Sequence, residues 1–189
     1  MEKIRTFIAI EIPLAIRTEI AKFQEQLKQE QAPISWVKPN NIHITIKFLG
    51  DVDENKIDDI ALAIQTATTE IKPFSIEIGG AGAFPNYKKP RVIWIGAKSE
   101  HDLLKELAKQ IDIQVHKLGF EKETRDFKAH LTLGRVKSLN DIDGVISELK
   151  QRQDFSGGSF IASEIILMKS ELHPAGSIYT PMRKIPLIS

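Results

Sequence analysis

The chain has 189 residues, enough for one ordinary domain or for two small lobes that share an interface. Its hydrophobic content of 42% and charged content of 27% are typical of a globular protein and argue against disorder. The formal net charge of +1 is too small for nucleic-acid binding by overall electrostatics, so a polyanionic substrate would need a local basic cluster. The absence of cysteine excludes disulfides, thiolate nucleophiles and zinc sites built from cysteine.

No apolar stretch of the sequence is long enough to cross a bilayer. The apolar run near the amino terminus is too short for a secretory signal, and it contains Glu11. We therefore expect a cytoplasmic protein, monomeric and without a membrane partner.

Apolar periodicity predicts strands and helices that alternate along the chain. Alternating or short apolar runs predict strands at 6–12, 35–37, 42–50, 74–78, 91–96, 129–136, 160–168 and 178–187. Apolar residues spaced three and four positions apart predict helices that begin near Pro13, near Asp53, after Ser99, and at Asn140 or Asp141. The glycines within 79–82 predict a bulge or a close backbone approach.

Two of these strands carry the same short pattern, His43-Ile44-Thr45-Ile46 and His130-Leu131-Thr132-Leu133. Successive residues of a strand point to opposite faces of its sheet. In each copy the histidine and the threonine should therefore share one face, and the aliphatic residues should share the other. Each strand can bury its aliphatic face and present an imidazole beside a hydroxyl on the polar face.

The spacing of these features indicates an internal duplication. The motif histidines lie 87 residues apart, and the strands that begin at Arg5 and Arg91 lie 86 residues apart. The order strand, helix, motif strand, helix, strand also occurs twice, which predicts halves of about 1–88 and 89–189. We expect two lobes related by a pseudo-twofold axis, with the motif strands meeting in the groove between them.

Two opposed histidines and two threonines are suited to acid–base chemistry on one small anionic group. The usual histidine pKa of about 6.5 allows one ring to act as base and the other as acid near neutral pH. Each role typically contributes about a hundred- to ten-thousand-fold in rate. A threonine hydroxyl on the same face can donate to a non-bridging phosphate oxygen.

Three neighbouring residues are further candidates for binding the substrate. Lys47 has the same parity as His43 and should face the groove. Arg135 offers a bidentate grip on phosphate, but its parity is unfavourable unless Gly134 bends the strand. Phe48 has the parity of a buried residue, yet its place at the strand end would let it stack on a base.

These residues also have structural and metal-binding interpretations. A single His-x-Thr in a strand is usually structural, whereas two copies in parallel contexts favour a site. A metal site needs a third ligand, and neither motif face supplies a carboxylate, so we expect no metal and no cofactor. Of the other histidines, His101 and His116 are expected at the surface, and His173 lacks a comparable setting. Trp36 and Trp94 are expected in the core.

The paired motifs and the sequence around them resemble the two-histidine (2H) phosphoesterase superfamily. Within it, the chain is similar to the RNA 2′,3′-cyclic phosphodiesterase branch, also called 2′-5′ RNA ligases. The matching stretches occur in the expected order along the chain and are 7–10, 41–50, 82–85, 91–96 and 129–135.

This resemblance implies a bilobal α+β fold of two antiparallel sheets with helices on their outer faces, as a single domain over residues 1–189 with a central groove. It implies metal-independent hydrolysis of RNA ends that bear a 2′,3′-cyclic phosphate, tRNA fragments among them, to give a 2′-phosphate. His43 would be the proton donor and His130 the proton acceptor. Thr45, Thr132 and Arg135 would hold the phosphate, and the reverse reaction would join RNA ends.

Two other functions remain open from the sequence. One is a non-catalytic RNA- or nucleotide-binding module that keeps the motifs for phosphate recognition. The presence of both histidines and both threonines favours an enzyme over such a module. The other is a phosphodiesterase that acts on small cyclic phosphates instead of RNA.

Overall fold

The structure of the protein is a computed structural model that describes residues 3–174 and 176–188. The strands are β1 (Lys3–Glu11), β2 (Ile34–Trp36), β3 (His43–Asp53), β4 (Phe74–Phe84), β5 (Val92–Ser99), β6 (His130–Val136), β7 (Ser156–Ala162), β8 (Glu164–Glu171) and β9 (Ile178–Pro186). The α-helices are α1 (Leu14–Lys28), α2 (Ile57–Ala67), α3 (Leu103–His116) and α4 (Asp143–Gln151).

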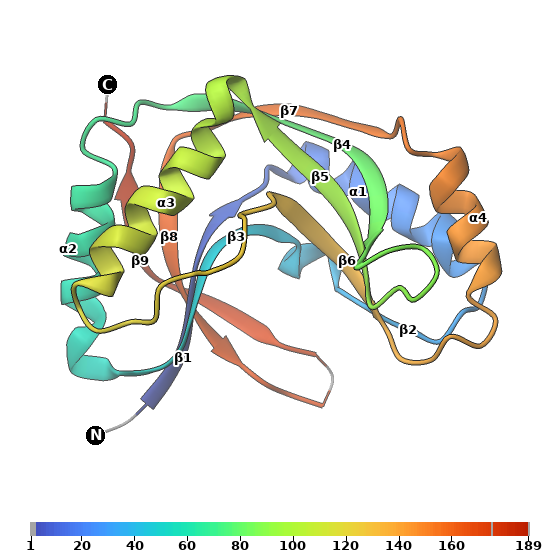
Figure 1. Ribbon diagram of the computed structural model, residues 1–189, viewed down its shortest axis with the longest axis horizontal. Coiled ribbons are helices and arrows are strands. Elements are labelled where there is room, and N and C mark those ends of the chain that lie inside the picture. Colours follow the sequence, from blue (N-terminus) through green and yellow to red (C-terminus); the bar gives the residue numbers. More distant parts are fainter. Residues whose placement is uncertain (1–2, 175, 189) are drawn as a thin grey trace.

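The strands form one strongly curled antiparallel sheet in the order β7-β4-β5-β6-β3-β1-β8-β9, with β2 paired to β6 (Figure 1). The two motif strands, β3 and β6, form the centre of this order. They pair through Ile44 and Leu131 alone. The predicted α+β fold with two lobes is confirmed. The structure has one continuous sheet in place of the two that were expected, because this pair joins them.

The strand order is symmetric about the contact between β3 and β6. On one side β3 is followed by β1 and β8, and on the other side β6 is followed by β5 and β4. This symmetry supports the proposed duplication. The order also shows that β4, from the first half of the chain, lies beside β5 of the second half, and that β8, from the second half, lies beside β1 of the first. Each lobe therefore contains strands from both halves of the chain.

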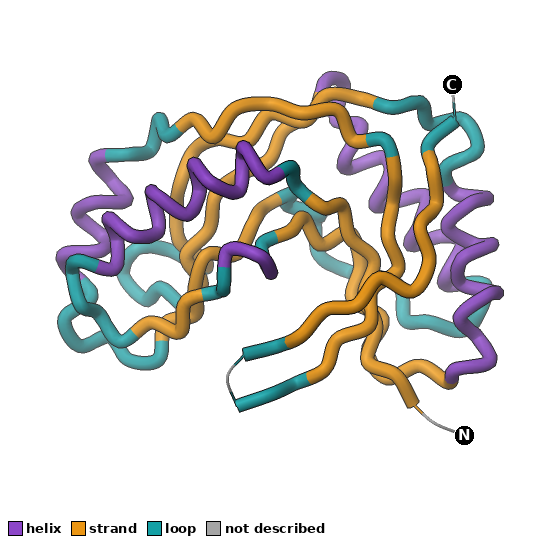
Figure 2. Tube along the Cα trace, turned by 180° about the vertical axis from the view of Figure 1, so that it is seen from behind, coloured by secondary structure: helices purple, strands orange, loops and turns teal. Residues whose placement is uncertain are grey.

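The helices cover the outer face of the curled sheet (Figure 2). Helices α2 and α3 pack on each other and on the lobe of β3 and β9, whereas α1 and α4 pack on the lobe of β4 and β7. The apolar stripe predicted for the first helix is confirmed, because Ile16, Ile20, Phe23 and Leu27 of α1 are buried. The helices therefore leave the inner, concave face of the sheet open.

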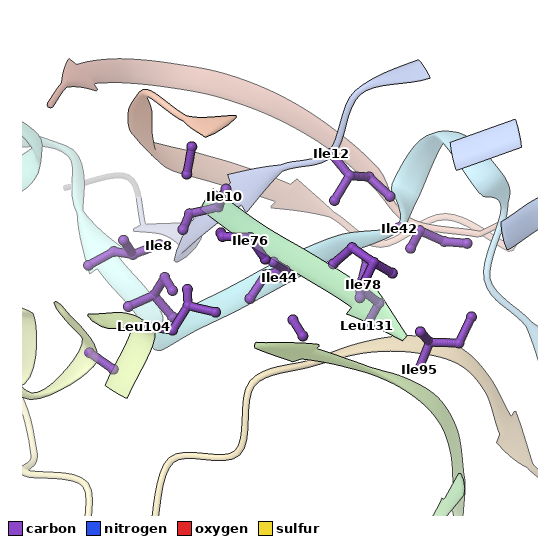
Figure 3. Close-up of a cluster of buried hydrophobic side chains, with 14 of the residues drawn as sticks. Ile8, Ile10, Ile12, Ile42, Ile44, Ile76, Ile78, Ile95, Leu104 and Leu131 are labelled. Carbon is purple, nitrogen blue, oxygen red and sulfur yellow. The ribbon is translucent and has the colours of Figure 1, made fainter. Parts of the chain in front are cut away.

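The core lies between the sheet and the helices and is rich in isoleucine (Figure 3). Ile8, Ile44, Ile95 and Leu131 are completely buried in it. Burial of one such side chain stabilises the folded state by about 1.5–3 kcal/mol. Since Ile44 and Leu131 belong to the motifs, the core holds the aliphatic faces of both motif strands.

The prediction of a single strand at 160–168 is wrong, because two strands, β7 and β8, share this range. The chain crosses from one lobe to the other at Ser163, so β7 pairs with β4 and β8 pairs with β1. Both pieces have apolar residues, and periodicity alone contains no information about such a crossing. The bulge predicted near the glycines is confirmed by a register shift between Gly79 and Ala81. Among the described residues, no helix has the length and apolar character needed to cross a membrane.

Gly134 should be intolerant of any side chain. A Cβ at this position of β6 would lie 2.5 Å from Ile34 Cγ2 and 3.0 Å from Trp36 Cε3. We expect Gly134→Ala to lower the free energy of unfolding by about 1–3 kcal/mol, as overpacking does. Urea denaturation would measure the change.

Gly144→Ala is the matched control for this prediction. Gly144 lies in α4, and the three atoms nearest to an added Cβ all belong to the flexible side chain of Glu30. Alanine is favoured over glycine in a helix by about 1 kcal/mol, so this variant should be neutral or more stable. Equal losses of stability in the two variants would contradict the close packing at Gly134.

Candidate active site

The two motif strands place their polar residues along one pocket on the concave face. His43 and Thr45 of β3 line it together with His130 and Thr132 of β6, and its volume is about 720 Å³. This volume falls within the usual range for small-molecule sites of about 300–1,000 Å³. The predicted division of each motif into a groove face and a core face is therefore confirmed.

Both catalytic candidates are anchored by the same backbone interaction. Nδ1 of His43 donates to the carbonyl oxygen of Asn41 at 2.7 Å, and Nδ1 of His130 donates to that of Lys128 at 2.6 Å. A carbonyl oxygen can only accept, so Nδ1 carries the proton in each neutral ring. Nε2 is then the nitrogen of each ring that can exchange a proton with a ligand.

His43 is the more enclosed of the two histidines. Its ring stacks on Phe7 with centroids 4.8 Å apart and meets the edge of Tyr179 at 5.3 Å, while Nε2 lies 2.9 Å from Thr45 Oγ1. Burial lowers the pKa of His43, the hydrogen bond to the Asn41 carbonyl opposes this effect, and the charge of His130 lowers the pKa further. Ligand-free His43 is thus biased toward the neutral imidazole.

Each motif strand contains a β-bulge directly after its threonine. In the pairing of β1 with β3, Ala9 faces Thr45 and Ile8 faces Lys47, so Ile46 is an extra residue. In the pairing of β5 with β6, Leu133 is the extra residue in the same way. A bulge inserts one residue and so reverses which face the following side chains occupy.

The bulges bring Arg135 and Phe48 to the groove. These residues hold equivalent positions in the two motif strands, and both line the pocket. For Arg135 this confirms the irregularity near Gly134 that was needed for its side chain to reach the groove. For Phe48 the alternation that indicated burial does not hold past the bulge, since the residue is 51% exposed. The guanidinium carbon of Arg5 lies 4.7 Å from the centroid of that ring.

The prediction that Lys47 faces the groove is wrong. The bulge at Ile46 turns its side chain to the opposite side of β3, where Nζ donates to Asp112 Oδ1 at 2.5 Å and to the Glu121 carbonyl oxygen at 2.9 Å. Both side chains of the ion pair are about nine-tenths buried, at 10% and 12% exposure. Lys47 therefore links β3 to α3 and to the loop that leads into β6.

One wall of the pocket was not foreseen from the sequence. Residues of the β8–β9 hairpin and its approaches, among them Ser170, His173 and Tyr179, line the pocket, as does Trp36 of β2. His173 was expected outside the site and Trp36 in the core. The hairpin reaches the pocket because Asn41 Nδ2 donates to the Ser177 carbonyl oxygen at 2.6 Å. Pairing between such distant segments has no local signal in the sequence.

This site is characteristic of the two-histidine phosphoesterases. The chain belongs to the LigT-like phosphoesterase family, whose model matches it twice, at residues 10–94 and at residues 95–179. The predicted family is thereby confirmed. Each match contains one copy of the histidine and threonine motif.

Similar proteins cover nearly the whole chain. An "RNA 2′,3′-cyclic phosphodiesterase" of Methanocaldococcus jannaschii is 42% identical over 95% of this chain and 99% of its own. A protein of the same name from Methanothermobacter thermautotrophicus is 38% identical over 95% of this chain and 97% of its own. Among solved structures, Thermus thermophilus TT0787 has a TM-score of 0.79 at 28% identity and covers 97% of each chain. E. coli LigT complexed with 3′-AMP has a TM-score of 0.78 at 25% identity and covers 100% of each chain.

The pKa of His43 provides a test of its environment. We expect its imidazole to titrate below the usual value of about 6.5 in the ligand-free protein, because burial disfavours the charged form. Inorganic phosphate in the pocket should move the titration to higher pH, since an anion favours the imidazolium. Long-range ¹H–¹⁵N NMR would follow both titrations and report the protonated nitrogen. Titration above 6.5 without ligand would contradict the structure.

The same shift predicts a dependence of stability on pH. Below pH 6.5 the unfolded chain takes up a proton at His43 that the folded protein resists. The free energy of unfolding should therefore fall as the pH drops through the unfolded pKa, and the fall should stop below the folded pKa. His43→Asn should lose this part of the dependence, whereas His116→Asn, on the surface of α3, should retain it.

Proposed function

We propose that this enzyme is an RNA 2′,3′-cyclic phosphodiesterase that opens the cyclic phosphate to a 2′-phosphate. The observation that carries the proposal is the pair of histidines in one pocket, each with Nδ1 held by a carbonyl oxygen and Nε2 available to the substrate. The printed names of the relatives support the substrate class. The E. coli structure with 3′-AMP supports binding of a nucleotide phosphate by this fold.

In the proposed mechanism the two histidines move one proton each. Neutral His130 accepts a proton at Nε2 from a water molecule as the water oxygen bonds to phosphorus. The bond from phosphorus to O3′ breaks, and protonated His43 donates its Nε2 proton to the departing O3′. Each transfer is expected to contribute about a hundred- to ten-thousand-fold in rate. The hydroxyls of Thr45 and Thr132 donate to the non-bridging oxygens as negative charge develops.

The bound substrate makes the donor role of His43 compatible with its lowered pKa. A phosphate anion next to the ring favours the imidazolium and so opposes the effect of burial. The neighbouring Thr45 hydroxyl can then turn its proton toward the phosphate. With an RNA 5′-hydroxyl in place of water, the same steps would join two RNA ends through a 2′,5′ linkage, and we propose this as a reversible side reaction.

We propose that Arg135 holds the phosphate of the terminal nucleotide and that Phe48 holds its base. The Arg135 guanidinium can bind phosphate oxygens bidentately. The exposed ring of Phe48, with the Arg5 guanidinium 4.7 Å from its centroid, offers an aromatic surface on which a base can stack. Such stacking is worth about 1–3 kcal/mol per base in single-stranded nucleic-acid binding.

We propose that catalysis needs no metal and no cofactor. No aspartate or glutamate is among the described residues that line the pocket. In the described parts of the chain, no group of three or more histidine, cysteine, aspartate or glutamate residues could hold a metal ion. The use of tRNA fragments, the monomeric state and the cytoplasmic location stay predictions.

An alternative is a phosphodiesterase of small cyclic phosphates, which would use the same two histidines. The extension of the pocket to the β8–β9 hairpin favours a longer substrate over a small one. A purely binding module is disfavoured because both proton-transfer sites are complete.

Loss of either histidine should abolish turnover. We expect His43→Ala and His130→Ala each to lower kcat for a 2′,3′-cyclic nucleotide by at least about a hundredfold, the range for one proton transfer. The assay contains EDTA, and chromatography identifies the product as a 2′- or 3′-phosphate. His116→Ala is the control and should keep wild-type activity. Full activity in either groove variant, or loss of wild-type activity on chelation, would overturn the mechanism.

A substrate with a better leaving group should separate the acid from the base. In a 3′-deoxynucleoside 2′-(4-nitrophenyl phosphate), nitrophenolate leaves without a proton, so a general acid is not needed. We expect His43→Ala to hydrolyse this ester at nearly the wild-type rate, while His130→Ala remains inactive. Release of nitrophenolate is followed by absorbance. The opposite pattern would exchange the two roles.

A further inference from the structure

We infer that Lys38 and His173 form, next to Arg135, a second phosphate subsite that binds the phosphodiester on the 5′ side of the terminal nucleotide. This inference rests on the proposed function and specifies its substrate class as RNA strands in preference to cyclic mononucleotides. Neither Lys38 nor His173 has a part in the proton transfers described above.

The two residues lie at the same end of the pocket. His173 accepts a turn hydrogen bond at its carbonyl oxygen from Gly176 N at 2.9 Å. A Cβ added to Gly176 would lie 3.6 Å from Lys38 Cε and 3.9 Å from Lys38 Nζ. The hydrogen bond from Asn41 to Ser177 holds the residue that precedes β9 against the segment that precedes β3. Lys38 and the turn of His173 are therefore neighbours, although 135 residues separate them in the chain.

Antiparallel pairing brings Arg135 to the same end. Because Ile44 pairs with Leu131, the residues of β6 that follow the motif lie beside the segment that precedes β3. Arg135 is also paired with Ser35, three residues before Lys38. Phe48 follows the motif on β3 and so lies toward the other end of the groove.

The charges of the pocket are segregated in favour of a polyanion. The chain has 26 basic and 25 acidic side chains in total, yet its described pocket-lining residues include lysine, arginine and histidine and no carboxylate. Within 3–174 and 176–188, no salt bridge involves Lys38, Arg135 or His173. Lys38 and His173 are exposed, so both side chains can reach a ligand.

The geometry of a ribonucleotide fits this arrangement. The base is attached to C1′ and the 5′ substituent to C4′, which lie at opposite ends of the C2′–C3′ edge that carries O2′ and O3′. With the cyclic phosphate between the histidines and the base on Phe48, the 5′ phosphodiester extends toward the end that holds Arg135, Lys38 and His173. A mononucleotide without a 5′ phosphate leaves this basic end unused, so remote binding energy is available only to a longer substrate.

The test compares adenosine 2′,3′-cyclic phosphate with the dinucleotide ApA 2′,3′-cyclic phosphate. We expect wild-type kcat/KM to be about tenfold higher for the dinucleotide, as expected for charge-assisted contacts to one phosphate. In the double variant Lys38→Ala/His173→Ala the ratio of the two kcat/KM values should approach one. Removal of the Lys38 contact should also reduce the slope of log(kcat/KM) against log salt for the dinucleotide by about 0.7.

The control is Lys88→Ala/Lys89→Ala, which removes two exposed lysines from a turn outside the pocket lining and should keep the wild-type ratio. Lys38→Glu should lower the ratio further than Lys38→Ala, because it places a negative charge beside the phosphodiester. Equal wild-type turnover of both substrates, or an unchanged ratio in the double variant, would overturn the subsite and leave the proposed function intact. Failure of the wild type to hydrolyse either substrate would instead refute the proposed function.

Discussion

The contact between the two motif strands, made by Ile44 of β3 and Leu131 of β6, holds the two motifs together. Both side chains are completely buried, and each is flanked in sequence by the histidine and threonine of its motif. Because neighbouring residues of a strand point to opposite faces, burial of this pair in the core directs both imidazoles into the groove. The packing that joins the two lobes thus also determines where the two histidines lie.

Much of this arrangement could be predicted from the sequence because it depends on local periodicity. The two-residue period assigned His43 and His130 to a common face, and the repeated order of elements indicated two related lobes. These inferences hold because a strand with one buried face has a strongly specified register. The exchange of β4 and β8 between lobes could not be predicted, since either half could complete its own lobe without any change in its periodicity.

Two of the residues that prediction misplaced, Lys47 and Phe48, lie beyond an irregularity of the backbone. Lys47 and Phe48 exchange faces because Ile46 is an extra residue in β3, and no property of isoleucine marks a bulge. Gly134 did indicate the irregularity in β6, because a glycine in a strand often marks a close backbone approach. His173 reaches the pocket through contacts between segments far apart in the chain, and a pattern within one segment has no bearing on such contacts.

The active site is nearly symmetric in its histidines and threonines, but its surroundings are not. His43 is enclosed by Phe7 and Tyr179, whereas His130 meets the edge of Phe84. Equivalent bulges bring an aromatic ring to the groove in one motif strand and a guanidinium in the other. A symmetric site would bind a cyclic phosphate in either of two orientations. An aromatic ring at one end and the Arg135 guanidinium at the other instead favour a single orientation of the nucleotide. The proposed mechanism requires one orientation if one histidine is always to serve as acid and the other always as base. In the proposed mechanism the duplicated unit would therefore supply the proton-transfer groups, and the divergence of residues at equivalent positions would give the reaction its direction.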